Sequence, residues 1–238
     1  MKKSLVFFRF GRLLPCLAMV ALVMPTVPGC RSTAKTSAPS TAASIQPFAE
    51  ATIILEHNAS DGDGEIVMFV KGGDIGLAEL SVSAPNGEVV LHVASPDKGV
   101  GYREFALETA EPALEQVLQA YPEGTYRFDG RDLRGARLHG EAVLAHHLPA
   151  SPVIDITRVE TGTVSWKSVP EAKLYRLEFE REDGDRDLLK FVLDLPNTFT
   201  TFRIPSAFLA PGDCQIGVAA VSGNGNVVVV EKEFTIRP

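Results

Sequence analysis

Cysteine is scarce in this sequence of 238 residues, which contains only Cys16, Cys30 and Cys214. Two of the three lie within the first thirty residues, so Cys214 stands alone in the rest of the chain. A small fold held together by disulfides needs an even set of paired cysteines, which this chain does not have. We therefore expect packed hydrophobic cores to stabilise the folded part.

The sequence also lacks the short motifs that mark common catalytic sites. Gly-x-Ser-x-Gly, His-Glu-x-x-His, Gly-x-x-x-x-Gly-Lys-Ser/Thr and Cys-x-x-Cys are all absent. Positive charge is in deficit too, because 23 Lys and Arg residues face 30 Asp and Glu residues, for a formal net charge of −7. An acidic surface repels nucleic acid. The composition thus predicts no enzyme, no cofactor and no nucleic-acid partner.

The first thirty residues are the most distinctive part of the chain. Basic residues, and no acidic ones, precede an apolar stretch over residues 13–27. A membrane-spanning helix needs about 20 apolar residues, so this shorter stretch favours an export signal. The basic residues of this leader are Lys2, Lys3, Arg9 and Arg12.

The end of the leader, Val27-Pro28-Gly29-Cys30, resembles the signal of bacterial lipoproteins. The resemblance implies that residues 1–29 are a signal peptide and that Cys30 carries a lipid that anchors the protein in the cell envelope. Arg31 resembles an outer-membrane sorting signal. Loss of the leader removes four positive charges and moves the formal net charge from −7 to −11, so acyl chains should hold the protein at the membrane. Ordinary secretion and an uncleaved anchor are the alternatives.

The segment after Cys30 consists mainly of Ser, Thr, Ala and Pro, with the sequence RSTAKTSAPSTAASIQP over residues 31–47. Such a segment has too little apolar surface to fold, so residues 30–47 are expected to form the lipidated cysteine and a flexible tether. A flexible chain of this length spans about 20–25 Å. The tether would therefore keep the folded part close to a membrane surface.

From residue 51 onward the sequence consists of short runs of alternating apolar residues, separated by turns rich in Gly, Pro, Asn and Asp. Helices and strands do not alternate regularly, so we predict an all-β fold of antiparallel sandwiches. The proline-rich residues 148–152 divide it into one sandwich over residues 48–148 and another over residues 151–238. The expected strands include residues 66–70, 88–93, 125–128, 175–179 and 226–234.

One short helix is expected in the first sandwich. Pro112 can open it, and Leu114, Val117, Leu118 and Tyr121 form one apolar stripe at helical spacing. A single helix at this place would serve as a crossover between the two sheets.

Residues 151–238 resemble a fibronectin type III domain in three segments. Thr163-Val164-Ser165-Trp166 is similar to the strand that carries the family's buried tryptophan, and residues 171–177 are similar to the next strand, with Tyr175 pointing inward. Residues 209–214 resemble the turn into a later strand, where the family has a tyrosine and this chain has Cys214. The resemblance implies a β-sandwich and brings no activity with it.

The first folded segment has a related arrangement near its end. Tyr126 stands two residues after Gly124, as Cys214 stands two residues after Gly212. The chain is therefore predicted to form two tandem immunoglobulin-like or fibronectin type III-like sandwiches.

An acidic turn over residues 58–65 suggests a weak calcium site, because Asp61, Asp63 and Glu65 supply the carboxylates that Ca²⁺ prefers. The spacing does not fit an EF-hand loop, since Gly64 as the loop glycine would put Ala59 at the first ligand position. A solvated turn is the alternative that we expect. No metal site is predicted.

Three other features could carry chemistry. His146 and His147 are adjacent, so in a strand they would point to opposite faces, and His139 lies too far upstream to join either of them on one ion. The arginines between residues 127 and 137 alternate with acids, which favours local ion pairs. Cys214 is expected to be buried and unreactive.

The sequence thus predicts an outer-membrane lipoprotein that acts as a binding or scaffolding module for a protein or a glycan. Sandwich modules bind through end loops or open edge strands, and neither specifies a ligand or an oligomeric state in a sequence. The two alternatives are an enzyme or metal-dependent hydrolase accessory, and a structural spacer.

Overall fold

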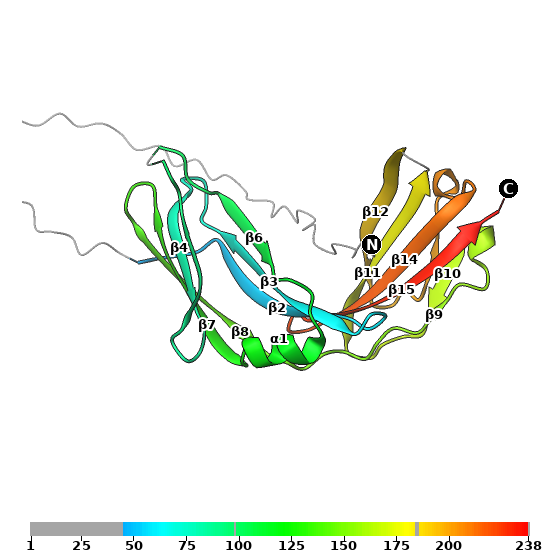
Figure 1. Ribbon diagram of the computed structural model, residues 1–238, viewed down its shortest axis with the longest axis horizontal. Coiled ribbons are helices and arrows are strands. Elements are labelled where there is room, and N and C mark those ends of the chain that lie inside the picture. Colours follow the sequence, from blue (N-terminus) through cyan, green and yellow to red (C-terminus); the bar gives the residue numbers. More distant parts are fainter. Residues whose placement is uncertain (1–44, 98, 184–185, 238) are drawn as a thin grey trace, which may run out of the picture. The chain divides into compact units, whose positions relative to one another are not determined.

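The computed structural model describes residues 45–97, 99–183 and 186–237 (Figure 1). The predicted signal peptide, the predicted lipid-bearing Cys30 and the tether up to residue 44 lie outside these residues. The described chain is built almost entirely of β-strands, with one α-helix and two short 3-10 helices. The predicted all-β fold is therefore confirmed.

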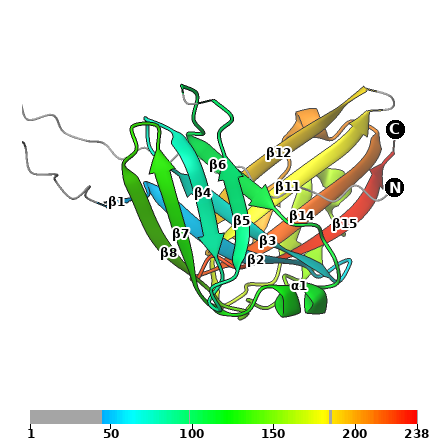
Figure 2. The ribbon, with the colours of Figure 1, turned by 60° about the vertical axis from the view of Figure 1, so that its left-hand side comes forward.

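The first sandwich packs a five-stranded sheet, in the order β1-β8-β7-β4-β5, against β2, β3 and β6. Figure 2 shows the five-stranded sheet toward the viewer. Its neighbouring strands are antiparallel except β1 and β8, which run parallel. The strands are β1 (Gln46–Pro47), β2 (Glu50–Asn58), β3 (Asp63–Lys71), β4 (Leu77–Ser83), β5 (Val89–Ala94), β6 (Glu104–Glu108), β7 (Gly124–Asp132) and β8 (Arg137–Leu144).

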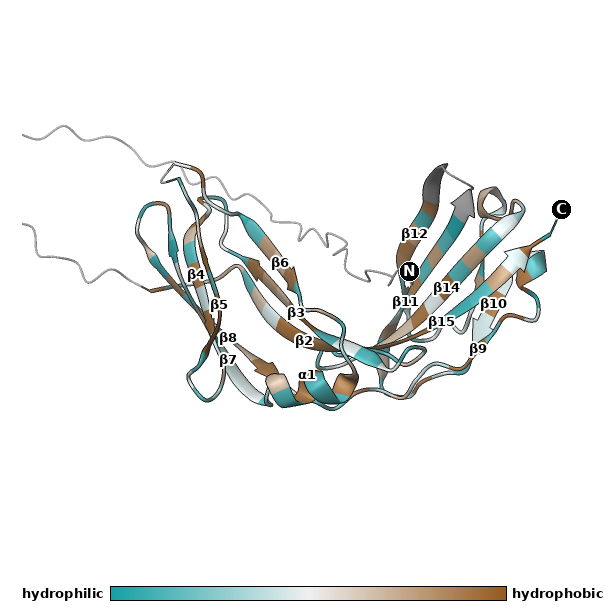
Figure 3. Ribbon diagram, viewed as in Figure 1, coloured by the Kyte–Doolittle hydropathy of each residue, from teal (hydrophilic) through white to brown (hydrophobic). Residues whose placement is uncertain are grey.

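The core of the first sandwich follows from the alternation of side chains along its strands. Ile53 and Leu55 of β2 point into it, and the apolar centre of β3 is seen as a continuous brown segment in Figure 3. Two aromatic rings of β7, those of Tyr126 and Phe128, are fully buried against them. Strand periodicity thus accounts for the core residues of β2 and β7.

The single helix lies where the sequence predicts it. Helix α1 (Leu114–Ala120) begins two residues after Pro112, and Val117 is buried in the core. Leu118 and Tyr121 also pack on the core, as the helical stripe requires. Because β6 and β7 belong to different sheets, the helix forms the predicted crossover.

The second sandwich packs a three-stranded sheet, in the order β13-β10-β9, against β12, β11, β14 and β15. The resemblance to a fibronectin type III domain predicted that Trp166 and Tyr175 are buried, and their exposed fractions are 5% and 0%. The strands are β9 (Ile154–Asp155), β10 (Thr163–Trp166), β11 (Ala172–Asp183), β12 (Arg186–Pro196), β13 (Thr201–Arg203), β14 (Gly212–Ser222) and β15 (Val227–Ile236).

Aromatic contacts dominate the core of the second sandwich. The Trp166 ring meets Tyr175 edge-on at 5.4 Å between centroids, and Phe179 stacks on Phe191 at the same distance. Phe208 meets Phe191 edge-on at 4.9 Å. Such pairs add about 0.5–1.5 kcal/mol each beyond the burial of their area.

The two sandwiches are joined by a strand pairing that the sequence did not predict. β15 and β2 run parallel and make one seven-stranded sheet, in the order β12-β11-β14-β15-β2-β3-β6. This seam is short, from Val227 beside Glu56 to Val229 beside Asn58. The sandwiches therefore share a sheet in addition to the proline-rich linker.

The folded part begins slightly earlier than expected. Gln46 and Pro47 form β1 and pair with Leu138 and His139 of β8, whereas the tether was expected to extend to residue 47. Backbone groups make this pairing, so the polar composition of the segment does not prevent it. The acidic turn is also shorter than expected, because β3 already begins at Asp63.

Candidate functional site

Asn226 ties the two sandwiches together at the seam. Its exposed fraction is 1%, and its side-chain oxygen accepts a hydrogen bond from the backbone N–H of Leu55 at 3.0 Å. Its side-chain nitrogen donates to the carbonyls of Ala145 at 2.6 Å and His147 at 3.0 Å. One amide thus joins β2, the chain after β8 and the start of β15, with its buried polar atoms paired.

Two carboxyl groups face each other beside this junction. Glu56 of β2 lies directly opposite Glu65 of β3, and their exposed fractions are 5% and 7%. Both residues alternate with core residues and so point to the other face of the sheet. Like charges directly opposite each other in a sheet are destabilising. The pair therefore favours protonated carboxyls.

Burial and neighbouring charges determine the protonation of Glu56 and Glu65. The pKa of Glu56 is raised to about 8, mainly by burial; Arg176 lowers it, while Glu108, Glu111 and Glu231 raise it. Burial raises the pKa of Glu65 to about 8 as well, with Glu56 as the next cause. Both carboxyls therefore hold a proton at neutral pH much of the time.

The pKa values of three other acids near Glu56 and Glu65 are raised as well. Burial and then Glu111 raise the pKa of Asp63 and of Glu108. Burial raises the pKa of Glu231, although a hydrogen bond from the Asn58 amide, 3.1 Å away, lowers it. We call the following set the seam carboxylates: Glu56, Asp63, Glu65, Glu108, Glu111 and Glu231.

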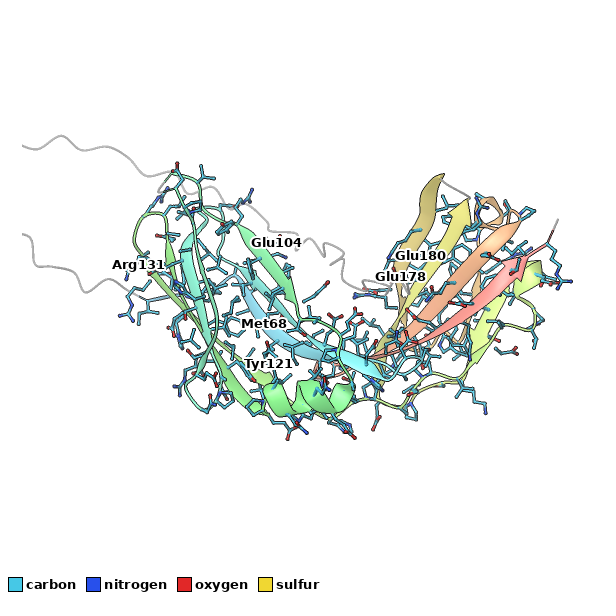
Figure 4. The ribbon with its side chains drawn as sticks, viewed as in Figure 1. Met68, Glu104, Tyr121, Arg131, Glu178 and Glu180 are labelled. Carbon is cyan, nitrogen blue, oxygen red and sulfur yellow. The ribbon has the colours of Figure 1, made fainter. Side chains whose placement is uncertain are left out.

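Positive charge near the seam carboxylates is already engaged. Arg176 binds both carboxylate oxygens of Asp194, with Nε to Oδ1 at 2.7 Å and Nη2 to Oδ2 at 3.0 Å. By contrast, Glu178 and Glu180 of β11, labelled in Figure 4, both pair with Lys190 of β12. The sheet therefore neutralises its acids on β11 but leaves those at the seam in excess.

The proposed calcium residues are only partly brought together. Asp61 lies in the exposed turn, Asp63 starts β3, and Glu65 faces Glu56 across the sheet. Over residues 45–97, 99–183 and 186–237, no three His, Cys, Asp or Glu residues are arranged to hold a metal ion. Glu65 was predicted as a candidate ligand, whereas Glu56, which follows the apolar run at residues 53–55, was not. A charged residue inside an apolar strand was the available signal.

The histidines take separate partners. The Nδ1 atom of His139 lies 2.9 Å from a carboxylate oxygen of Asp129. His146 reaches the carbonyl of Tyr121 at 2.8 Å through Nε2, whereas Nε2 of His147 lies 3.6 Å from the carboxylate of Glu171. Each of these three histidine rings thus contacts a different partner.

The predicted ion pairs of the arginine-rich segment are present for two of its members. Arg131 Nε lies 3.0 Å from the carboxylate of Glu79 on β4, and Arg127 Nε lies 3.6 Å from that of Glu141 on β8. Both pairs are exposed cross-strand contacts, which contribute little to stability.

Cys214 is buried, as predicted, with an exposed fraction of 5%. Burial raises the pKa of its thiol. Arg181, directly opposite on β11, lowers that pKa but does not outweigh burial. The sequence does not reveal this basic neighbour, because Arg181 is 33 residues away along the chain.

No protein-family model and no curated protein sequence matches the chain. Solved structures that resemble it include the FN1-FN3 domains of chicken CNTN1 (10% identity, 81% of this chain, 66% of that chain, TM-score 0.36). They also include a two-domain fibronectin type III segment of chicken tenascin. Its identity to this chain is 12%, the match covers 79% of this chain and 95% of that chain, and the TM-score is 0.29. A tetra-tandem repeat from the extending region of a large adhesion protein is similar as well, with 11% identity and a TM-score of 0.28. The match covers 79% of this chain and 50% of that chain, so this chain spans half of that structure.

The assignment of two sandwiches rests on the strand topology itself: two cores, each between two sheets. None of the helices in the described part of the chain is long and apolar enough to cross a membrane.

Proposed function

We propose that this protein is an outer-membrane lipoprotein whose two sandwiches form a binding or scaffolding module for a protein or glycan partner of the cell envelope. The seam carboxylates support a binding role most directly. Among the described side chains, none pairs with Glu56, Glu65, Glu108 or Glu111, and the set extends from a buried seam to the exposed edge strand β6. The proposal assigns no catalytic step, cofactor or metal.

The proposed anchor is the lipid on Cys30. The basic leader, the short apolar run and the Gly29-Cys30 junction support it. Changing Cys30 to Ala should move the protein from the membrane to the soluble fraction or block removal of the leader. Full-size mature protein that remains in the membrane fraction would contradict the anchor.

The binding role is tested with the full chain. Envelopes are cross-linked and solubilised, the protein is isolated, and the retained partner is identified by mass spectrometry. The matched control is the Cys30→Ala variant, which should lose partners that depend on membrane attachment. Recovery of the protein without any partner, at several cross-linker lengths, would contradict a binding or scaffolding role.

A structural spacer is the second candidate, and the shared seven-stranded sheet favours it. A seam that includes backbone pairing and the Asn226 hydrogen bonds resists bending better than a flexible linker. A spacer should tolerate charge substitutions on its faces, whereas a binding module should not.

A further inference from the structure

Exposed apolar side chains gather at one end of the first sandwich. Over the described ranges, four of the eight large apolar residues that are exposed lie where β4, β6 and β8 begin: Ile45, Ile75, Val100 and Tyr102. The other four are divided between the opposite end of this sandwich and the second sandwich. Single exposed apolar residues are common on protein surfaces, whereas a group of them marks a contact surface.

Three of these residues belong to two loops that lie against each other, one before β4 and one before β6. A Cβ atom added to Gly76 would meet the backbone of Gly101 at 3.2 Å, so the loops touch at these two glycines. Two backbone hydrogen bonds at Tyr102, of 2.7 and 2.9 Å, join the loops at the same place. Ile75 precedes the first glycine, and Val100 and Tyr102 flank the second. The three apolar side chains therefore start from one small area.

Ile45 connects this area to the start of the described chain. Gln46 pairs with Leu138 near the start of β8, and β8, β7 and β4 are neighbours in the sheet. Ile45 thus lies about three strand spacings, or about 14 Å, from the start of β4. Residues 31–44, which lie outside the described residues, are the predicted tether, and a flexible chain of this length spans about 20 Å. A lipid on Cys30 would keep this end of the sandwich near the bilayer.

Two exposed arginines stand beside the apolar side chains. Arg134 belongs to the turn between β7 and β8, and Arg137 begins β8. Among the described side chains, none pairs with either of them, whereas Arg131, labelled in Figure 4, lies 3.0 Å from Glu79. Guanidinium groups bind phosphate oxygens, so these two arginines suit the phosphates of lipid headgroups.

A bilayer surface fits this end of the sandwich in three respects. Apolar side chains on loop tips can enter the headgroup region, and tyrosine is enriched at that depth in membrane proteins. Arginine is attracted to anionic lipids. The lipid attachment makes the contact intramolecular, so that even a weak interaction with the bilayer persists.

We propose that this end of the first sandwich lies on the membrane to which the protein is anchored. Ile75, Val100 and Tyr102 enter the headgroup region, while Arg134 and Arg137 bind lipid phosphates. This inference rests on the lipid anchor proposed above and adds a second, non-covalent contact with the bilayer.

The contact would orient the whole folded part. β2 begins at Glu50 near the membrane-facing end, but it pairs with β15 only from Glu56 onward. The seam therefore lies about 20 Å farther along β2. The second sandwich joins the first at this distant place, which leaves the second sandwich free for a partner in the envelope.

The test uses the full-length lipidated protein in vesicles of phosphatidylethanolamine and phosphatidylglycerol, with brominated acyl chains that quench tryptophan on contact. Val100→Trp should show a blue shift and lose fluorescence in these vesicles relative to vesicles without bromine. The matched control is Val143→Trp at the opposite end of β8, because the exposed fractions of Val143 and Val100 are 65% and 69%. It should be unaffected, as should the native Trp166. Ile75→Trp is a second probe of the same contact, and thermal unfolding checks the fold of each variant.

The arginines are tested in the Val100→Trp protein. Each arginine near an anionic surface should change the ratio of bound to free orientations by about fivefold, so Arg134→Gln/Arg137→Gln should reduce quenching strongly. The control Arg158→Gln/Arg203→Gln, at exposed positions of the second sandwich, should leave quenching unchanged. In vesicles of phosphatidylcholine alone, both pairs of substitutions should have no effect.

Three results would overturn the inference. Equal quenching of Val100→Trp and Val143→Trp would mean that the sandwich has no preferred orientation. Absence of quenching at both Val100→Trp and Ile75→Trp would mean that this end does not touch the bilayer. A blue shift that appears only when envelope proteins are added to the vesicles would show that the surface binds a protein instead.

The inference and the proposed anchor can fail separately. Wild-type protein that floats with the vesicles, together with an unquenched Val100→Trp, would leave the anchor intact and reject the membrane contact. Wild-type protein that does not float with the vesicles would reject both.

Discussion

In the first sandwich the chain enters β7 through Gly124, and the hydroxyl of Tyr126 donates a hydrogen bond to the carbonyl of Pro122 at 3.1 Å. In the second it enters β14 through Gly212, and Cys214 takes the place of the tyrosine. Both glycines have positive φ, 135° and 151°, which other residues rarely adopt. The backbone turn is therefore common to both, and the anchoring side chain differs.

The cysteine cannot anchor the turn as the tyrosine does. Its sulfur lies 3.7 Å from the Gly212 carbonyl, and a thiol is a weak donor. The second sandwich has instead a cluster of aromatic rings, including Phe208 of the 3-10 helix η2 (Ser206–Phe208), which leads toward the same turn. Core packing can therefore hold the turn where a local hydrogen bond is missing.

The largest effect is expected from removal of an aromatic ring in the second sandwich. Trp166→Ala should lower its free energy of unfolding by about 3–5 kcal/mol, because a buried ring leaves a cavity. Calorimetry should show the second sandwich melting first. The control Val143→Ala, at an exposed position of β8, should change little. Equal destabilisation of both sandwiches would show that they unfold as one unit.

The next effect tests whether the sandwiches are coupled. Asn226→Ala leaves the buried N–H of Leu55 without its acceptor, and should cost about 2–4 kcal/mol. Hydrogen exchange at the Leu55 amide should accelerate, and one melting transition should separate into two. The control is Asn86→Ala, which removes a hydrogen bond to the Glu88 amide in an exposed turn and should cost less than 1 kcal/mol. An unchanged Leu55 amide would argue against the role of Asn226.

A smaller effect is expected from pH, and it should originate in the first sandwich. The pKa values of Glu56 and Glu65 are raised from 4.5 to about 8, so the folded state holds more protons than the unfolded state between these values. Stability is then greatest below about pH 4.5 as far as these groups are concerned, and it falls as pH rises toward 8.

We expect a loss of about 2 kcal/mol between pH 6 and pH 8, measured by denaturant unfolding. The Glu56→Gln/Glu65→Gln variant should show a flatter profile over this range, whereas Glu88→Gln should follow the wild type. Stability that rises with pH in the wild type would contradict the assignment of protonated carboxyls.

The smallest effect concerns the turn itself. Tyr126→Phe removes one hydrogen bond and should cost about 1 kcal/mol in the first sandwich. Cys214→Ser keeps a small side chain at the matching place and should leave the turn in the second sandwich in position. Chemical shifts of Gly124 and Gly212 report the two turns separately. A larger change at Gly212 than at Gly124 would reverse the comparison.

Local patterns in the sequence determined most of the strands, helix α1 and the burial of Trp166 and Tyr175. These features depend on spacings of two to four residues, which alternate side chains between the inside and the outside of an element. The same patterns predicted the two cores and the separation near the proline-rich linker, because each sandwich must bury its own apolar faces.

Only the tertiary structure decided how the sandwiches meet and which acids cluster there. The bond between Leu55 and Asn226 joins residues 171 positions apart, and no local pattern specifies which edge strands will pair. The carboxyl of Glu56 is an ordinary glutamate in the sequence. Its pKa is raised chiefly because folding removes the carboxyl from water, and also because folding brings Glu108, Glu111 and Glu231 near it.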